Sequence, residues 1–204
     1  MNIDERTGKP KIILHLCADM GSDSLPYKYN GYDVRCIGKD IGVENFIPPK
    51  NVYGIIANPP CTMFSIARTK AKISRNLEEG MRLVKECLRV IWTCQYRIYS
   101  ENPRHSHLKF WCIENPASGF LKWFLGKATY EYSPHEYGAP FTKQTALWGQ
   151  FNVPDKVIIK NQAITIEDSF RGGMLYMGNQ RINKTIEKSN CWIGFARAFY
   201  EANR

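Results

Sequence analysis

The chain has 204 residues, of which 44% are hydrophobic, and its 28 lysine and arginine residues outnumber its 19 acidic residues. This length and apolar content predict a single domain over residues 1–204 and leave no room for a large second domain. The net charge of +9 favours a polyanionic partner such as nucleic acid, although charge alone does not identify one.

The cysteines and the apolar runs exclude several classes of protein. The seven cysteines are scattered and include no Cys-x-x-Cys pair, so neither a disulfide framework nor a zinc site is indicated. No run approaches the roughly 18 consecutive apolar residues of a membrane span. The polar start, Met1–Arg6, lacks the apolar core of a signal peptide. We therefore expect a cytoplasmic protein that uses neither a metal nor a membrane.

The first half of the chain predicts strands that alternate with helices. Residues 11–17 read as a strand that leads into a small, polar turn, and a helix follows to about residue 30. Residues 33–40 read as a second strand that ends in an acid, and residues 53–58 as a third. Apolar residues at three- and four-residue steps predict a long amphipathic helix over residues 76–99.

The second half continues this alternation. Residues 110–114 read as another strand, residues 130–151 as strands and turns beyond the core sheet, and residues 192–203 as a closing helix. Residues 152–183 show no interpretable pattern. The order of elements predicts an α/β fold with a mostly parallel sheet and helices on both faces.

The most informative motif lies where the strand over residues 53–58 ends. Asn58 is followed by Pro59, Pro60 and Cys61. The prolines restrict the backbone, so the next side chain projects from a rigid corner. Open α/β sheets bind ligands at the carboxyl ends of their strands. Cys61 is therefore a candidate nucleophile, whereas a cysteine without this context would be read as a buried structural thiol.

A second strand end carries an acid. The strand over residues 110–114 closes with Glu114, Asn115 and Pro116. A thiolate adds to an electron-poor ring only if the charge that it pushes forward is neutralised elsewhere, and an acid at a nearby strand end can do this. The two strand ends together predict covalent chemistry assisted by proton transfer.

A basic segment follows the candidate nucleophile, with positive charges at Arg68, Lys70, Lys72 and Arg75. It could close over a bound nucleotide and contact phosphates. It could equally be a solvated connection into the long helix, because charge runs are common on surfaces. The sequence does not choose between these readings.

The order of these motifs resembles the cytosine 5-methyltransferases, most closely the short forms found among phage and prophage proteins, some of which belong to restriction–modification and other DNA methylation systems. The resemblance covers nearly the whole chain and implies a Rossmann-like fold that binds S-adenosylmethionine. The matching motifs are the first strand and glycine loop Leu16–Gly21, Pro60-Cys61 with Phe64-Ser65, Glu114-Asn115, and Gly194-Phe195-Ala196.

The resemblance implies a role for each matched residue. Cys61 is expected to attack carbon 6 of cytosine while Glu114 donates a proton or hydrogen bond to ring nitrogen 3. The residues expected to bind S-adenosylmethionine are Cys17, Ala18, Asp19, Met20, Gly21, Asp40, Asn58 and Pro59, with Asp40 accepting hydrogen bonds from the ribose. Those expected to bind substrate are Pro60, Ser65, Arg68, Asn115 and Lys143. The implied partner is double-stranded DNA, from which the base is flipped.

The chain departs from the family pattern at four positions. Thr62 replaces the usual glutamine, Pro116 the usual valine, and Ser22 a second glycine, while Lys143 stands near the place of an arginine that helps to hold the cytosine. No segment is long enough for a full-sized target recognition domain. We therefore expect sequence specificity that is low or supplied by a protein partner.

Other functions stay open at this point. The run Asn58-Pro59-Pro60 is also similar to the motif of amino-group DNA methyltransferases, which place an aromatic residue where Cys61 stands. A catalytically inactive, methyltransferase-like DNA-binding protein and an enzyme of free nucleotides or RNA are further alternatives. Replacing Cys61 by serine separates the first two readings, because it should abolish carbon methylation but could spare amino methylation.

Overall fold

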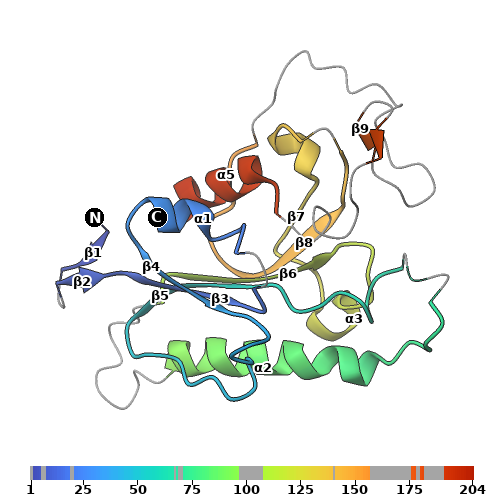
Figure 1. The fold of residues 1–204 in the computed structure, drawn as a ribbon, viewed down its shortest axis with the longest axis horizontal. Helices are drawn as coiled ribbons and strands as arrows, with labels where there is room; N and C mark the ends of the chain where they lie inside the picture. Colours follow the sequence, from blue (N-terminus) through green and yellow to red (C-terminus); the bar gives the residue numbers. More distant parts are fainter. Residues whose placement is uncertain are drawn as a thin grey trace.

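The computed structural model describes residues 2–5, 8–18, 21–66, 68, 71–96, 108–139, 141–156, 176–177, 180–181 and 191–204. A six-stranded sheet in the order β4-β3-β5-β6-β8-β7 forms its centre (Figure 1). The strands are β3 (Ile12–Leu16), β4 (Asp33–Ile37), β5 (Val52–Ala57), β6 (Phe110–Pro116), β7 (Tyr130–Tyr132) and β8 (Thr145–Gln150).

Most of this sheet is parallel. Strands β4, β3, β5 and β6 pair in parallel, and β8 runs antiparallel to both of its neighbours, β6 and β7. The chain passes from β3 to β4 on one side and then returns to place β5 on the other side of β3. The strand order therefore reverses between β3 and β5, and such switch points are where open α/β sheets bind ligands.

Helices cover both faces of the sheet (Figure 1). The long helix α2 (Leu77–Tyr96) lies on one face, and α1 (Leu25–Tyr29) and α5 (Ile193–Asn203) lie on the other. The short helix α3 (Lys122–Leu125) follows the carboxyl end of β6, and the 3-10 helix η2 (Pro134–Tyr137) precedes β8. Two small antiparallel hairpins complete the described elements: β1 (Ile3–Asp4) with β2 (Lys9–Pro10), and β9 (Tyr176–Met177) with β10 (Gln180–Arg181).

The two faces of the sheet have different cores. Under α2 the core is mainly aliphatic, and the helix buries one stripe consisting of Met81, Val84, Cys87, Val90, Ile91 and Cys94. Under α1 and α5 the core is aromatic, and the rings of Tyr132 and Phe195 stack with their centroids 3.7 Å apart. Burial of these apolar surfaces is the main force that fixes the helices against the sheet.

The structure confirms the α/β class and corrects one strand. The strand predicted over residues 33–40 ends at Ile37, and Asp40 lies exposed in the turn that follows. The helix predicted over residues 76–99 is observed from Leu77 to Tyr96, and its last predicted residues lie outside the described part. Within the described residues, no helix has both the length and the apolar character needed to cross a membrane. The single-domain organisation stays a prediction.

Candidate active site

The end of β5 presents Cys61 at the surface on a tight turn. The backbone N–H groups of Phe64 and Ser65 both donate to the carbonyl of Cys61, at 2.9 and 2.8 Å. The Phe64 side chain is fully buried in the aliphatic core, whereas Cys61 is exposed. The turn is therefore anchored from below by an aromatic ring and carries Cys61 at the surface.

Neighbouring segments hold this turn in place. The amide Nδ2 of Asn115 donates to the Pro59 carbonyl at 3.0 Å. The guanidinium of Arg75 donates to the carbonyls of Met63 and Ser65, at 2.5 and 3.0 Å. These contacts come from β6 and from the segment before α2. The position of the thiol thus depends on chain far from Cys61 in the sequence.

Glu114 lies at the neighbouring strand end, inside the sheet. Parallel pairing of β5 with β6 ends at Ala57 and Ile113, and Glu114 continues the strand by pairing with Leu147 of β8. Its side chain is only 17% exposed, and Oε1 lies 3.6 Å from Nζ of Lys143. The acid is therefore fixed by strand pairing on one side and lies close to the Lys143 ammonium on the other.

The thiol and the acid share an electrostatic environment with Lys143. Burial raises the pKa of Glu114 above its ordinary value, and Asp23 adds to the rise while Lys143 opposes it. Desolvation also raises the pKa of the Cys61 thiol, with a further contribution from Glu114, and Lys143 again acts in the opposite direction. A raised pKa favours a protonated Glu114, as a proton donor requires. The Lys143 charge favours the Cys61 thiolate.

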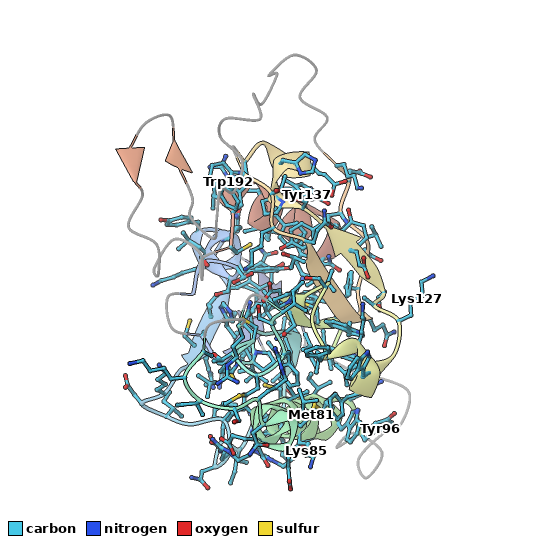
Figure 2. The ribbon with its side chains drawn as sticks, turned by 90° about the vertical axis from the view of Figure 1, so that its right-hand side faces the viewer. Met81, Lys85, Tyr96, Lys127, Tyr137 and Trp192 are labelled. Atoms are coloured by element: carbon cyan, nitrogen blue, oxygen red, sulfur yellow. The ribbon has the colours of Figure 1, made fainter. Side chains whose placement is uncertain are left out.

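A pocket lies beside Glu114 on the aromatic side of the sheet. It contains about 320 Å³ of space, part of it open to solvent. Its polar lining includes Asp23, Asn58, Glu114 and Lys143, and its apolar wall includes Tyr132 and Trp192. Figure 2 shows Trp192 next to Tyr137 of η2, and the indole Nε1 donates to the Tyr137 carbonyl at 2.9 Å. Carboxylates and aromatic rings thus face one space.

A buried histidine organises one side of this pocket, and the sequence did not reveal it. His15 lies in β3 with its Nδ1 2.9 Å from Oγ of Ser24 and its Nε2 2.9 Å from Oδ1 of Asn58. Burial lowers its pKa, so the imidazole is neutral near pH 7, and the Asn58 oxygen assigns its proton to Nε2. The Asn58 amide then faces Asp23, 3.5 Å from Oδ2.

The available signals for these residues were a histidine within an apolar strand and an acid in the turn after it. Sequence reasoning found no metal-ligand spacing around His15 and did not single out Asp23 as a site residue. The hydrogen bond from His15 to Asn58 joins residues 43 positions apart, a contact that only the fold can make. Asp23 reaches the pocket because the β3–α1 connection folds back over the end of β5.

Most of the described residues predicted to bind the cofactor lie near the ends of β3 and β5, whereas Asp40 lies exposed in the turn after β4. Cys17 directly follows β3 with a positive φ of 56°, and Gly21 has a φ of 69°. A Cβ atom at Gly38 would lie 2.8 Å from the Ala18 carbonyl oxygen, so the ends of β3 and β4 meet closely there. Asp19 and Met20 lie outside the described residues. Asn58 and Pro59 directly follow β5.

The residues predicted to bind substrate divide into two groups. Pro60 is exposed beside Cys61, and Lys143 lines the pocket. By contrast, Asn115 is fully buried, so it positions the turn through Pro59 and does not reach a substrate in this structure. Arg68 donates to the carbonyls of Ile73 and Ser74, so its guanidinium holds its own loop. Ser65 contributes its backbone to the turn and to Arg75.

The comparisons with known proteins give no family for this arrangement. No protein-family model matches the chain, and no curated protein shows significant similarity to it. Among the described residues, no group of three or more histidine, cysteine, aspartate or glutamate side chains is arranged to hold a metal ion. The function must therefore be argued from the geometry: an exposed thiol, a buried acid with a raised pKa and a lysine that interacts with both.

Proposed function

We propose that this chain is an S-adenosylmethionine-dependent enzyme that methylates carbon 5 of cytosine in DNA through a covalent bond to Cys61. One observation carries the proposal: the exposed thiol after β5 and the buried acid of β6 occupy neighbouring strand ends and share the influence of Lys143. An acid and a nucleophile of this kind are what addition to an electron-poor ring requires.

The residues at the switch point fit an adenosyl group. The loop after β3 and the residues after β5 border the reversal of strand order, where ligands of open α/β sheets bind. The positive φ of Gly21 and the close approach of Gly38 to Ala18 keep this edge free of bulky side chains. When bound there, S-adenosylmethionine supplies an electrophilic methyl group. Cys17, Ala18, Gly21 and Asn58 are the described residues that would hold it.

Two side chains, Cys61 and Glu114, then carry out the chemistry on the base. Cys61 as thiolate forms a bond from Sγ to carbon 6, and Glu114 gives its proton to ring nitrogen 3, which leaves carbon 5 electron-rich. When the cofactor is bound, its S–CH3 bond would break as carbon 5 takes the methyl group, with S-adenosylhomocysteine as the leaving group. Carbon 5 then loses its proton to solvent. The bond from Sγ to carbon 6 breaks, and Glu114 recovers its proton from nitrogen 3. Cys61 and Glu114 thus return to their starting states.

Lys143 has opposite effects on the two reacting groups. Its charge opposes the rise in the pKa of Cys61 that burial and Glu114 cause, so the thiolate fraction at neutral pH is larger than it would be without Lys143. It also limits the rise in the pKa of Glu114 and so works against the proton donor. Its Nζ lies 3.6 Å from Glu114 Oε1, and in the sequence it stands near the place of the arginine that the family resemblance expects to help hold the cytosine. We propose that Lys143 contacts the base through the same ammonium group.

The proposal distinguishes this chain from amino-group methyltransferases. Those enzymes need a stacking ring at the position of Cys61, and the thiol there is exposed on a rigid turn. An exposed thiol near an acid whose pKa is raised favours attack on carbon over stabilisation of an amino group.

The test uses duplex DNA that carries 5-fluorocytosine in many sequence contexts. The protein is incubated with this DNA and S-adenosylmethionine, denatured, and measured by intact mass spectrometry. Fluorine replaces the hydrogen at carbon 5, so no proton can leave and the bond to Cys61 cannot break. A covalent complex should therefore accumulate with the mass of the protein, the DNA strand and one methyl group. Peptide mapping should place the bond at Cys61.

Two serine variants complete this experiment. Cys61→Ser should form no complex, whereas Cys36→Ser, which alters an exposed cysteine on β4, should form as much as the unmodified protein. If the protein binds S-adenosylmethionine but forms no complex with any context, carbon methylation of DNA is ruled out. Methylation of adenine or of the cytosine amino group by Cys61→Ser would instead support the amino-methyltransferase reading.

A further inference from the structure

Exposed aromatic rings lie next to the Cys61 turn, on the segment that follows β6. Trp123 is 67% exposed and Phe124 is 47% exposed, and both belong to the short helix α3. Together with the half-buried Phe120 they form a group that we call the aromatic step. Large exposed rings that lie close together mark interaction sites more often than isolated ones do.

The rings of the aromatic step are ordered by contacts with one another and with Arg75. The centroids of Phe120 and Trp123 lie 4.5 Å apart, with their planes at 50°. The guanidinium carbon of Arg75 lies 4.5 Å from the centroid of Phe120, on the face of the ring. Phe124 contacts the edge of Phe64 at a centroid distance of 6.3 Å. The ring of Trp123 is thus held in place by packing against Phe120, which Arg75 covers in turn.

Hydrogen bonds tie the aromatic step to the turn that carries the nucleophile. The N–H of Phe120 donates to the Phe64 carbonyl at 3.0 Å, and Arg75 bonds two further carbonyls of the turn. A Cβ atom at Gly119 would lie 3.0 Å from the Pro116 carbonyl oxygen and 3.1 Å from that of Phe64, so the approach is close. A ligand on Trp123 would therefore lie at a fixed position relative to Cys61.

The charge of this region indicates what would bind there. Residues 61–75 and 117–128 contain no aspartate or glutamate, and their basic residues are Arg68, Lys70, Lys72, Arg75, Lys122 and Lys127. Lys122 directly precedes Trp123, Lys127 follows α3, and both are exposed. Figure 2 shows Lys127 pointing away from the protein. Aromatic faces next to lysines that reach solvent are the surface that binds bases and phosphates of a single strand.

We propose that the aromatic step is a stacking site for an unpaired base of the nucleic-acid strand, with Lys122 and Lys127 contacting its phosphates. The proposal rests on the proposed function, because it requires a strand whose cytosine reaches Cys61, and the aromatic step is joined to the turn that carries Cys61. It gives the chain a means of holding distorted DNA without a full-sized recognition domain. Since every base has a π face, this contact adds affinity with little sequence preference.

The test is equilibrium binding of a fluorescent DNA duplex with a single unpaired cytosine, measured by anisotropy without S-adenosylmethionine. Trp123→Ala should weaken binding by roughly 5- to 150-fold, which is the loss expected when one base no longer has an aromatic side chain to stack on. Trp123→Phe should recover most of the affinity, because a smaller ring can still stack. Trp92→Ala is the matched control, since Trp92 is also a large exposed tryptophan, 52% exposed, but belongs to α2.

Salt dependence separates stacking from the phosphate contacts. Lys122→Gln combined with Lys127→Gln should reduce the slope of log affinity against log salt, whereas Trp123→Ala should leave the slope unchanged. Equal affinities for Trp123→Ala and Trp92→Ala would overturn the proposal, as would a lack of DNA binding by the unmodified protein. Self-association that Trp123→Ala abolishes, with DNA binding intact, would assign the surface to a second copy of the chain instead.

The outcome is distinguishable from failure of the proposed function. If DNA binds and Trp123→Ala weakens it, but no 5-fluorocytosine complex forms, the stacking site stands and carbon methylation does not. If the covalent complex forms equally with Trp123→Ala and Trp92→Ala, and DNA binding is also equal, the carbon-methylation proposal is supported and the stacking-site proposal is overturned.

Discussion

The neighbouring ends of β5 and β6 are built in opposite ways. Strand β5 leads into an exposed turn. Side chains from other segments hold this turn, namely Asn115 of β6 and Arg75 before α2. Strand β6 instead stays within the sheet through Pro116, because β8 continues to pair with it after β5 has ended. A nucleophile must be reached by its substrate, whereas a proton donor must be kept from water to stay protonated. The difference gives each strand end the environment that its proposed task requires.

The largest expected effect comes from removing the acid at the buried end. Glu114→Gln keeps the size and the hydrogen-bonding capacity of the side chain but cannot donate a full proton to ring nitrogen 3. We expect methyl transfer to DNA to slow by about 10²- to 10⁴-fold, the usual contribution of general acid catalysis. Single-turnover transfer of labelled methyl from S-adenosylmethionine to DNA measures this rate.

The matched control for this variant is Glu131→Gln, which alters an exposed glutamate on β7. Its rate should equal that of the unmodified protein. A rate for Glu114→Gln within about threefold of the control would show that Glu114 is not the acid, since general acid catalysis contributes far more than that.

A second variant, at Lys143, changes the charge next to both Cys61 and Glu114. Lys143→Gln removes the cation that lowers the pKa of Cys61 and of Glu114, so both pKa values should rise. The thiolate fraction of Cys61 then falls at any pH below its pKa, and alkylation by iodoacetamide should become several-fold slower near neutral pH. Peptide mass spectrometry over a pH series measures this rate at Cys61, with the exposed Cys36 as an internal reference.

Lys143→Arg keeps the charge and should restore the alkylation profile of Cys61. If Lys143→Gln alkylates at the same rate as the unmodified protein at every pH, Lys143 does not control the thiol. The charge would then act on Glu114 alone, and the two strand ends would be electrostatically independent.

A third variant loosens only the exposed end. Arg75→Met keeps the aliphatic length but loses the hydrogen bonds to Met63 and Ser65 and the contact with Phe120. Hydrogen bonds from charged groups contribute about 1.5–3 kcal/mol, so we expect a loss of about that size in the free energy of unfolding. Urea unfolding measures it, and amide hydrogen exchange should show faster opening at residues 61–65.

Arg35→Met is the control for this loss, because Arg35 makes an exposed ion pair with Asp33 on β4 and such pairs contribute little. A change in the exchange of residues 110–116 as large as that at 61–65 would contradict the expectation that Arg75 holds the β5 turn alone.

Local patterns in the sequence were sufficient for the main elements and for the two strand ends. Apolar runs gave β3, β5 and β6, and the three- and four-residue steps gave α2, because these elements bury one face or both. Strand-end logic placed Cys61 and Glu114 at the same edge of the sheet. The end of β4 was overestimated because β3 is its only partner among the described strands, and its pairing with β3 stops at Leu16 and Ile37.

The contacts that complete the site could not be predicted in this way. The sequence indicated that Arg75 is part of a basic surface segment. In the structure its guanidinium instead donates hydrogen bonds to carbonyls 10 and 12 residues earlier in the chain. Asp23 enters the pocket only because the connection after β3 folds over Asn58. Neither contact leaves a periodic pattern, since each joins one side chain to a backbone or loop that the fold brings near.

The smallest expected effect concerns the histidine beneath the β5 end, and it appears as a dependence on pH. Burial lowers the pKa of His15 below its ordinary value of 6.5, so the unfolded chain binds a proton more readily than the folded protein does. The stabilisation from the neutral form is therefore complete above about pH 6.5 and is lost as the pH falls through the folded-state pKa. One such proton changes the free energy of unfolding by at most about 1.4 kcal/mol per pH unit.

His15→Gln removes this titration and keeps a hydrogen-bonding side chain between Ser24 and Asn58. Urea unfolding between pH 5 and pH 7 should therefore show a shallower fall in stability on acidification than the unmodified protein shows. His135→Gln, at an exposed position of η2, should keep the original slope. If His15→Gln and the unmodified protein lose stability in parallel, His15 is not held neutral. The imidazole could then carry a proton beside Asp23, and Asn58 would no longer be oriented by a neutral ring, so the exposed strand end would rest on a charged support.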